Sequence, residues 1–132
     1  LARYEERPVH LLHLSARESV EELRRARAEG VAATGEVTPH HLCATDELVR
    51  SLDANTKMNP PLRGETDRAT LVEALRGALA ETKNMPRIDK PIPIVLSGGT
   101  AKPKGFLDRF RQAIDRDGFP LSVSEIRMAE TR

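Results

Sequence analysis

This sequence of 132 residues contains one cysteine, few aromatic residues and no long apolar run. Its positive and negative charges nearly balance. The single cysteine, Cys43, excludes an intrachain disulfide and is typical of a cytoplasmic protein. Aromatic residues make up only 3%, so platforms on which single-stranded bases could stack are lacking. The formal net charge of +1 gives no reason to expect a nucleic-acid partner.

The apolar runs are also too short to cross a membrane. The chain opens with LARYEERP, where two glutamates stand in place of the apolar segment of a signal peptide. We therefore expect a cytoplasmic protein without a membrane partner. The length and the 39% of hydrophobic residues are enough for the core of one domain, and we expect a single α/β domain over residues 1–132.

Short apolar stretches alternate with amphipathic ones along the chain. Strands are expected at residues 8–14, 31–37, 91–97 and 121–128. The stretch 91–97 is the best candidate for a central strand, because its β-branched run carries no charge and is typical of a strand covered on both faces. The sequence thus predicts about four mainly parallel strands with helices packed on the sheet, and it leaves the strand order open.

The helix after the first strand has signals at both ends. Ser15 and Glu18 have the spacing of a capping box, and Gly30 is a typical residue just past a helix end. Residues 8–37 therefore read as a strand–helix–strand unit of the length that joins parallel strands. Further on, the prolines in 53–65 indicate a loop before a long helix.

Three motifs in the first part of the chain occur in a characteristic order. VHLLHLS ends a strand with His13, EVTPHHL carries His40 and His41, and NPPLR lies in the loop before the long helix. Together they resemble, over about residues 8–80, the C-terminal half of the barrel of dihydroorotase, a binuclear zinc amidohydrolase of pyrimidine synthesis. The resemblance implies that His13 binds one zinc and that Asn59 contacts dihydroorotate, with Arg63 in the same loop.

The other parts of that family's metal centre have no counterpart in this sequence. The family also uses a His-x-His pair, a carboxylated lysine or an aspartate, a further histidine and a catalytic aspartate. Because a zinc site needs three or four protein ligands, His13 alone does not make one. We therefore expect His13 to be a hydrogen-bonded strand-end histidine, Asn59 and Arg63 to be vestigial, and the chain to hold no cofactor.

A second pattern begins at the strand 91–97. There IVLSGGT is followed by a proline, a glycine and an amphipathic helix. This resembles, over about residues 88–130, the adenosine-binding strand and loop of the actin and Hsp70 ATPase superfamily. The resemblance implies that the backbone of Gly98 and Gly99, with Thr100 after them, lies against a nucleotide. The alternative is an ordinary strand-to-helix turn in which glycine relieves crowding.

Two resemblances that meet near residues 81–87 predict a chimera of a dihydroorotase-like fragment, 1–82, and an actin-like fragment, 83–132. The leading hypothesis is a folded domain without catalytic activity, not an enzyme, that can form homo-oligomers by pairing of exposed sheet edges or by helix packing. The second is a weak nucleotide- or phosphate-binding module that uses Gly98, Gly99 and Thr100. The third is a residual metal-dependent amidohydrolase.

Overall fold

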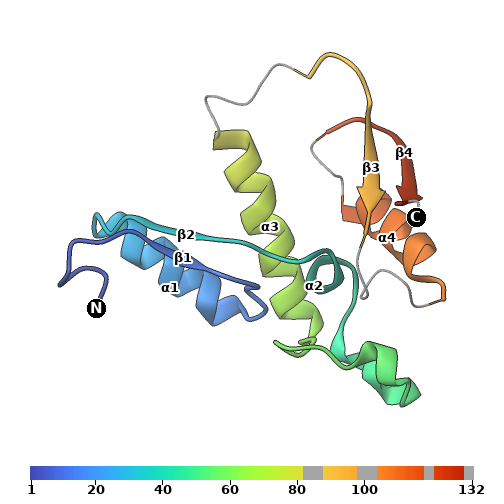
Figure 1. Ribbon diagram of the computed structural model, residues 1–132, viewed down its shortest axis with the longest axis horizontal. Coiled ribbons are helices and arrows are strands. Elements are labelled where there is room, and N and C mark those ends of the chain that lie inside the picture. The colour runs from blue at the N-terminus through green and yellow to red at the C-terminus, as the bar shows by residue number, and fades with distance from the viewer. Residues whose placement is uncertain (82–87, 98–103, 118–120, 130–132) are drawn as a thin grey trace. The chain divides into compact units, whose positions relative to one another are not determined.

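The computed structural model describes residues 1–81, 88–97, 104–117 and 121–129. The chain divides into two compact units, Leu1–Ala74 and Leu75–Arg132, and helix α3 (Glu65–Glu81) runs from the first into the second. Each unit holds one pair of parallel strands joined through a helix (Figure 1). The predicted α/β class is confirmed, although the strands form two separate two-stranded sheets. That the chain is one domain stays a prediction.

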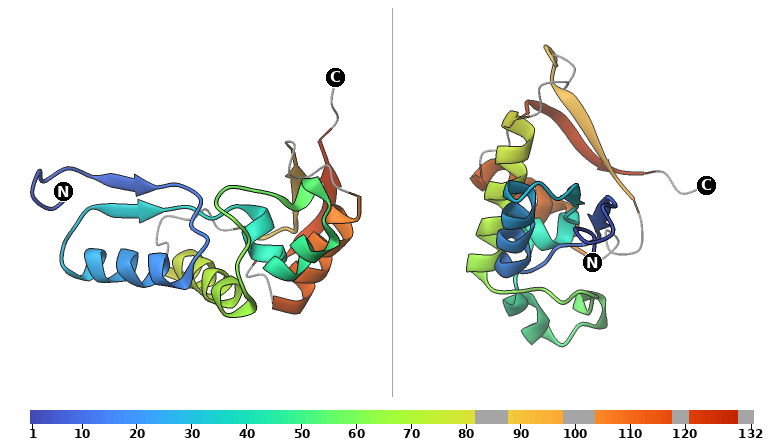
Figure 2. Two further views of the ribbon diagram at one scale, coloured as in Figure 1. Left: turned by 90° about the horizontal axis from the view of Figure 1, so that it is seen from below. Right: turned by 90° about the vertical axis from the view of Figure 1, so that its left-hand side faces the viewer.

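The first unit begins with the predicted strand–helix–strand arrangement. Strand β1 (Val9–Leu11) leads into helix α1 (Arg17–Ala28), which leads into strand β2 (Ala33–Gly35). The strands pair in parallel, with Val9 opposite Ala33. Figure 2 shows α1 running along one face of the strand pair. Strand β2 and the helix approach closely: a Cβ added to Gly35 would lie only 2.8 Å from Leu14 Cδ1 and 2.9 Å from Leu23 Cδ2.

The two ends of α1 are stabilised in different ways. The predicted capping box is wrong, because Ala16 is the N-cap residue and its side chain makes no cap bond. Instead, the Arg17 N–H donates to Asp67 Oδ1 of α3 at 2.8 Å. At the other end Gly30 has φ +83°, and its N–H donates to the Arg27 carbonyl while the next N–H donates to the carbonyl of Ala26, which is a Schellman motif.

The segment after β2 is built from short helices and a loop. Helix α2 (Pro39–Cys43) is followed by the 3₁₀ helices η1 (Asp46–Ser51) and η2 (Ala54–Thr56), and the loop at 57–64 leads into α3. Arg68 of α3 is only 5% exposed. Its guanidinium donates to both Glu65 carboxylate oxygens, at 2.8 and 2.5 Å, and to the Leu42 carbonyl at 2.9 Å. This buried arginine fastens α2 to the start of α3.

The second unit repeats the strand–helix–strand order with β3 (Ile92–Leu96), α4 (Phe106–Asp117) and β4 (Val123–Met128). The two strands pair in parallel along their whole length, with an irregularity between Ile92 and Pro93. A small core forms between this strand pair and α4; its buried members are Leu96, Phe110, Ala113 and Ile126. The strands predicted at 91–97 and 121–128 are both present. Among the described helices of the whole chain, none is both long and apolar enough to span a bilayer.

Candidate functional site

The carboxyl ends of β1 and β2 bring two histidines to one carboxylate. His13 lies just past β1 with φ +54°, a conformation that non-glycine residues seldom adopt. Backbone hydrogen bonds hold the segment, because the Glu36 N–H donates to the Leu11 carbonyl and the Leu14 N–H donates to the Glu36 carbonyl. His13 Nε2 lies 3.2 Å from Glu36 Oε1, and His10 Nε2 lies 3.6 Å from Oε2. One carboxylate therefore faces both imidazoles.

Sequence reasoning missed Glu36. The signal that could have found it is its place just past β2, since residues that follow neighbouring parallel strands meet at the same sheet edge. His10 is oriented further by Thr34, its partner in the strand register, through a 2.7 Å contact between Nδ1 and Oγ1. The side chains of His10, His13 and Glu36 are each close to half exposed, so the cluster faces solvent.

Helix α2 holds the other two histidines in buried positions. His40 is 9% exposed and His41 is 2% exposed, and their ring centroids lie 4.4 Å apart. Burial, together with the like charges of the neighbouring His41 and His13, lowers the pKa of His40 to about 4. Burial also lowers the pKa of His41, although hydrogen bonds from its ring to the carbonyls of Pro60 and Pro61 act in the opposite direction. Both rings are neutral at pH 7.

His41 connects α2 to the NPPLR loop, residues 59–63. Its Nδ1 lies 2.7 Å from Thr38 Oγ1, and its Nε2 lies 3.0 Å from the Pro60 carbonyl oxygen. The charges of Arg63 and His13 both lower the pKa of His41, so both residues lie within electrostatic range of its ring. The structure thus brings the three motifs of the sequence together around α2.

Within the loop the side chains alternate between solvent and interior. Asn59 and Arg63 are exposed, whereas Leu62 is 4% exposed and anchors the loop in the first unit. The Asn59–Pro60 peptide bond is cis. The Arg63 carbonyl accepts a hydrogen bond from the Asp46 N–H at 3.0 Å. The two residues that the resemblance assigns to substrate therefore present their side chains outward.

The described residues do not form a complete metal site. No group of three histidine, cysteine, aspartate or glutamate side chains in the described ranges is arranged to hold an ion. His13 has a solvent-accessible imidazole beside a carboxylate and could supply one ligand, but a zinc site needs three or four. The fit to a binuclear centre is therefore limited to one position.

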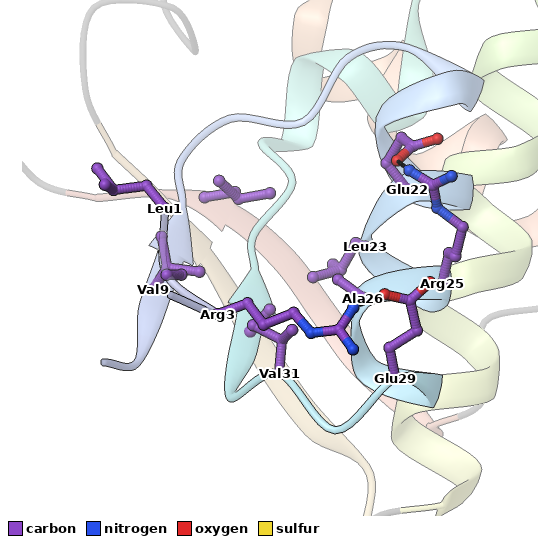
Figure 3. A pocket seen from close by; sticks show the side chains of 12 residues that line it. Leu1, Arg3, Val9, Glu22, Leu23, Arg25, Ala26, Glu29 and Val31 are labelled. Atoms are coloured by element: carbon purple, nitrogen blue, oxygen red, sulfur yellow. Dashed lines mark hydrogen bonds and ion pairs between the residues drawn. The ribbon is translucent and has the colours of Figure 1, made fainter. Parts of the chain in front are cut away.

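Two other candidate sites are separate from this cluster. Gly98, Gly99 and Thr100, the predicted nucleotide-binding residues, lie outside the described residues. A pocket of about 320 Å³ lies in the first unit between α1, the strand pair and the N-terminal segment, and includes Leu23 and Ala33 (Figure 3). An ion pair of 2.8 Å joins Arg3 and Glu29 at its edge. None of the residues predicted from the sequence lines this pocket.

Comparison with known proteins decides between the hypotheses for the first part of the chain. It is 46% identical over 90 residues to a dihydroorotase of Caldanaerobacter subterraneus, a match that covers 64% of this chain and 21% of the relative. It is 52% identical over 66 residues to a dihydroorotase of Bacillus subtilis, covering 50% and 15%, and 56% identical over 73 residues to one of Streptomyces coelicolor, covering 55% and 16%. About half of this chain is homologous to dihydroorotases. No family model matches the chain.

The hypothesis of a domain without enzymatic activity is therefore wrong, and the dihydroorotase hypothesis, ranked third from the sequence, is the one that the comparisons favour. The error came from counting missing ligands as evidence against an enzyme. This chain spans only about a fifth or less of the length of these relatives, so a complete set of ligands is not to be expected within it. The actin-like resemblance, the chimera and the homo-oligomer remain untested predictions.

Proposed function

We propose that residues 8–80 are the part of a dihydroorotase-like amidohydrolase that supplies one metal-binding histidine and the substrate loop, and that the protein hydrolyses the ring amide of dihydroorotate. The observation that carries this proposal is the identity of 46–56% to three dihydroorotases. The geometry supports it, because His13, α2 and the NPPLR loop are separated in sequence but lie around one ring, that of His41.

Each residue has a role that suits its chemistry. His13 is the ligand, and the Glu36 carboxylate lies 3.2 Å from its Nε2 and also faces His10. Asn59 offers an amide that can donate and accept hydrogen bonds, and Arg63 offers a guanidinium that pairs with carboxylates. Bound metal supplies an activated water in this chemistry. The contribution of this segment is to place a ligand and to bind and orient the anionic substrate.

The proposal is tested by grafting. In the graft enzyme, the matching segment of the Bacillus subtilis dihydroorotase is replaced by residues 8–80, and dihydroorotate ring opening is measured. We expect kcat/KM within about a hundredfold of the parent enzyme, since a misplacement of about 1 Å costs that much. His13→Ala in the graft should cost at least about a further hundredfold. Asn59→Ala should raise KM about tenfold or more, as expected for a lost hydrogen bond to a charged ligand.

Arg50→Ala is the matched control for Arg63→Ala. Arg50 lies in η1 with its side chain 79% exposed, and its ion pair is with its neighbour Glu47. Its removal should leave kcat and KM unchanged, whereas Arg63→Ala should raise KM. A graft that folds, as judged by circular dichroism, yet opens the ring no faster than buffer would refute the proposed function.

A further inference from the structure

The NPPLR loop depends on side chains for its anchoring. Two consecutive prolines, Pro60 and Pro61, carry no N–H, so this stretch has few donors with which to build regular backbone structure. Its carbonyl oxygens still need hydrogen-bond partners where they are covered. The imidazole of His41 meets this need at Pro60, with 3.0 Å between Nε2 and the carbonyl oxygen.

The partners of His41 determine which ring nitrogen carries the proton. A carbonyl oxygen only accepts, so Nε2 must donate to Pro60. Nδ1 then accepts from the hydroxyl of Thr38 at 2.7 Å. With 2% of the residue exposed, water does not compete for either bond. Thr38 therefore selects the tautomer of His41 that can hold the loop.

His41 stands on a firmly held element. Helix α2 starts with Pro39, whose φ is fixed for a helix, and its Leu42 carbonyl accepts from the buried Arg68. Arg68 is itself held by both oxygens of Glu65. A loop tied to such a helix keeps its outward side chains, Asn59 and Arg63, in one arrangement.

From these contacts we infer that His41 is the positioning residue of the NPPLR loop: its Nε2–H fixes the Pro60 carbonyl, so that Asn59 and Arg63 meet the substrate in the binding geometry. The inference rests on the proposed function and deepens it. His41 acts through the loop and not on the reacting atoms. Its loss should therefore weaken substrate binding and leave the chemical step nearly unchanged.

Substitutions at position 41 separate the effect of losing the hydrogen bond to Pro60 from the effect of losing the buried ring. His41→Phe keeps a buried ring but removes the donor. His41→Gln places an amide N–H near the position of Nε2, whereas His41→Asn places its amide near Nδ1 and cannot reach Pro60. In the graft enzyme we expect His41→Phe and His41→Asn to raise the KM for dihydroorotate about tenfold with kcat changed less than about threefold, and His41→Gln to recover most of the loss.

His40 offers the matched control, because it is the adjacent buried histidine and makes neither of the two hydrogen bonds of His41. His40→Phe should leave KM within about twofold. A second measurement does not depend on activity. In the full 132-residue chain, hydrogen exchange of the Asp46 amide, which donates to the Arg63 carbonyl, should be faster in His41→Phe and unchanged in His40→Phe.

The outcomes are distinguishable. Suppose that the graft is active and that His41→Phe leaves KM unchanged, or that the KM of His41→Asn is as low as that of His41→Gln. The inference is then overturned and the proposed function stands. If the unsubstituted graft is inactive, the proposed function fails and the inference is decided by hydrogen exchange. In that case equal Asp46 exchange in the parent chain and in His41→Phe would overturn it, and faster exchange confined to His41→Phe would support the anchoring of the loop.

Discussion

At the scale of single residues, the buried histidines of α2 link protonation to folding. Folding lowers the pKa of His40 from its usual value to about 4, because burial and the neighbouring histidines disfavour the charged form. The unfolded chain therefore binds one more proton than the folded chain between about pH 4 and the ordinary pKa of about 6.5. It follows that the stability contributed by neutral His40 is complete above that window and is lost as the pH falls through it.

We expect the free energy of unfolding to decrease by about 1–2 kcal/mol between pH 7 and pH 5. The lowered pKa of His41 adds to the loss in the same direction. Urea unfolding followed by circular dichroism at several pH values measures this dependence. In His40→Gln, which cannot take up the proton, the slope should be clearly smaller; equal slopes in the two proteins would show that His40 is not the group responsible.

Gly35 tests the close packing of β2 against α1. Gly35→Ala should destabilise the first unit by about 1–3 kcal/mol, since the new methyl would lie too close to Leu14 Cδ1 and Leu23 Cδ2 and both side chains would have to shift. Gly77→Ala is the control, because a Cβ there meets nothing within 4 Å and a helix interior favours alanine. It should stabilise by a few tenths to about 1 kcal/mol. Thermal unfolding measures both changes in stability. If both variants were stabilised, or both destabilised, relative to the parent chain, this packing would be contradicted.

At the scale of elements, α1 receives its N-terminal cap from α3. Asp67→Ala should cost about 1 kcal/mol in urea unfolding, the usual value for losing a capping side chain. Glu18→Ala distinguishes this arrangement from the capping box predicted from the sequence. Glu18 is exposed, and its substitution should change stability by less than about 0.5 kcal/mol. A larger loss of stability in Glu18→Ala than in Asp67→Ala would contradict the cap from α3 and favour the capping box.

The same case shows what sequence alone could predict. Residues 8–37 formed the expected parallel unit because apolar spacing and the Gly30 signal are local. The cap of α1 was not predictable, because its donor and acceptor are 50 positions apart. The partition into two pairs was also missed, because apolar spacing predicts single strands and does not determine which strands pair.

The candidate site shows a similar limit. His13, Asn59 and Arg63 stand out as motif residues, so the sequence was sufficient to name them. Glu36 is recognised only when its strand is paired, and the bond from His41 to Pro60 spans 19 positions of sequence. Side chains that support a site belong to no local pattern, which explains why the sequence assigned His41 no role in the site.

At the scale of the whole molecule, the similarity to dihydroorotases covers part of this chain and a smaller part of each relative. The match to the Caldanaerobacter dihydroorotase covers 64% of the chain, a larger share than residues 8–80 make up. The similarity therefore extends beyond the stretch that the motifs marked. It still spans only 21% of the relative, so we propose for this chain's own residues a ligand and a substrate loop and not the full reaction.

The measurement that tests the central claim most directly is dihydroorotate hydrolysis by the graft enzyme with and without His13→Ala and Asn59→Ala. The account predicts an active graft, a loss of turnover of at least about a hundredfold in His13→Ala, and a raised KM in Asn59→Ala. An active graft in which both substitutions leave kcat and KM unchanged would contradict it, because the segment would then be a scaffold without a part in the site.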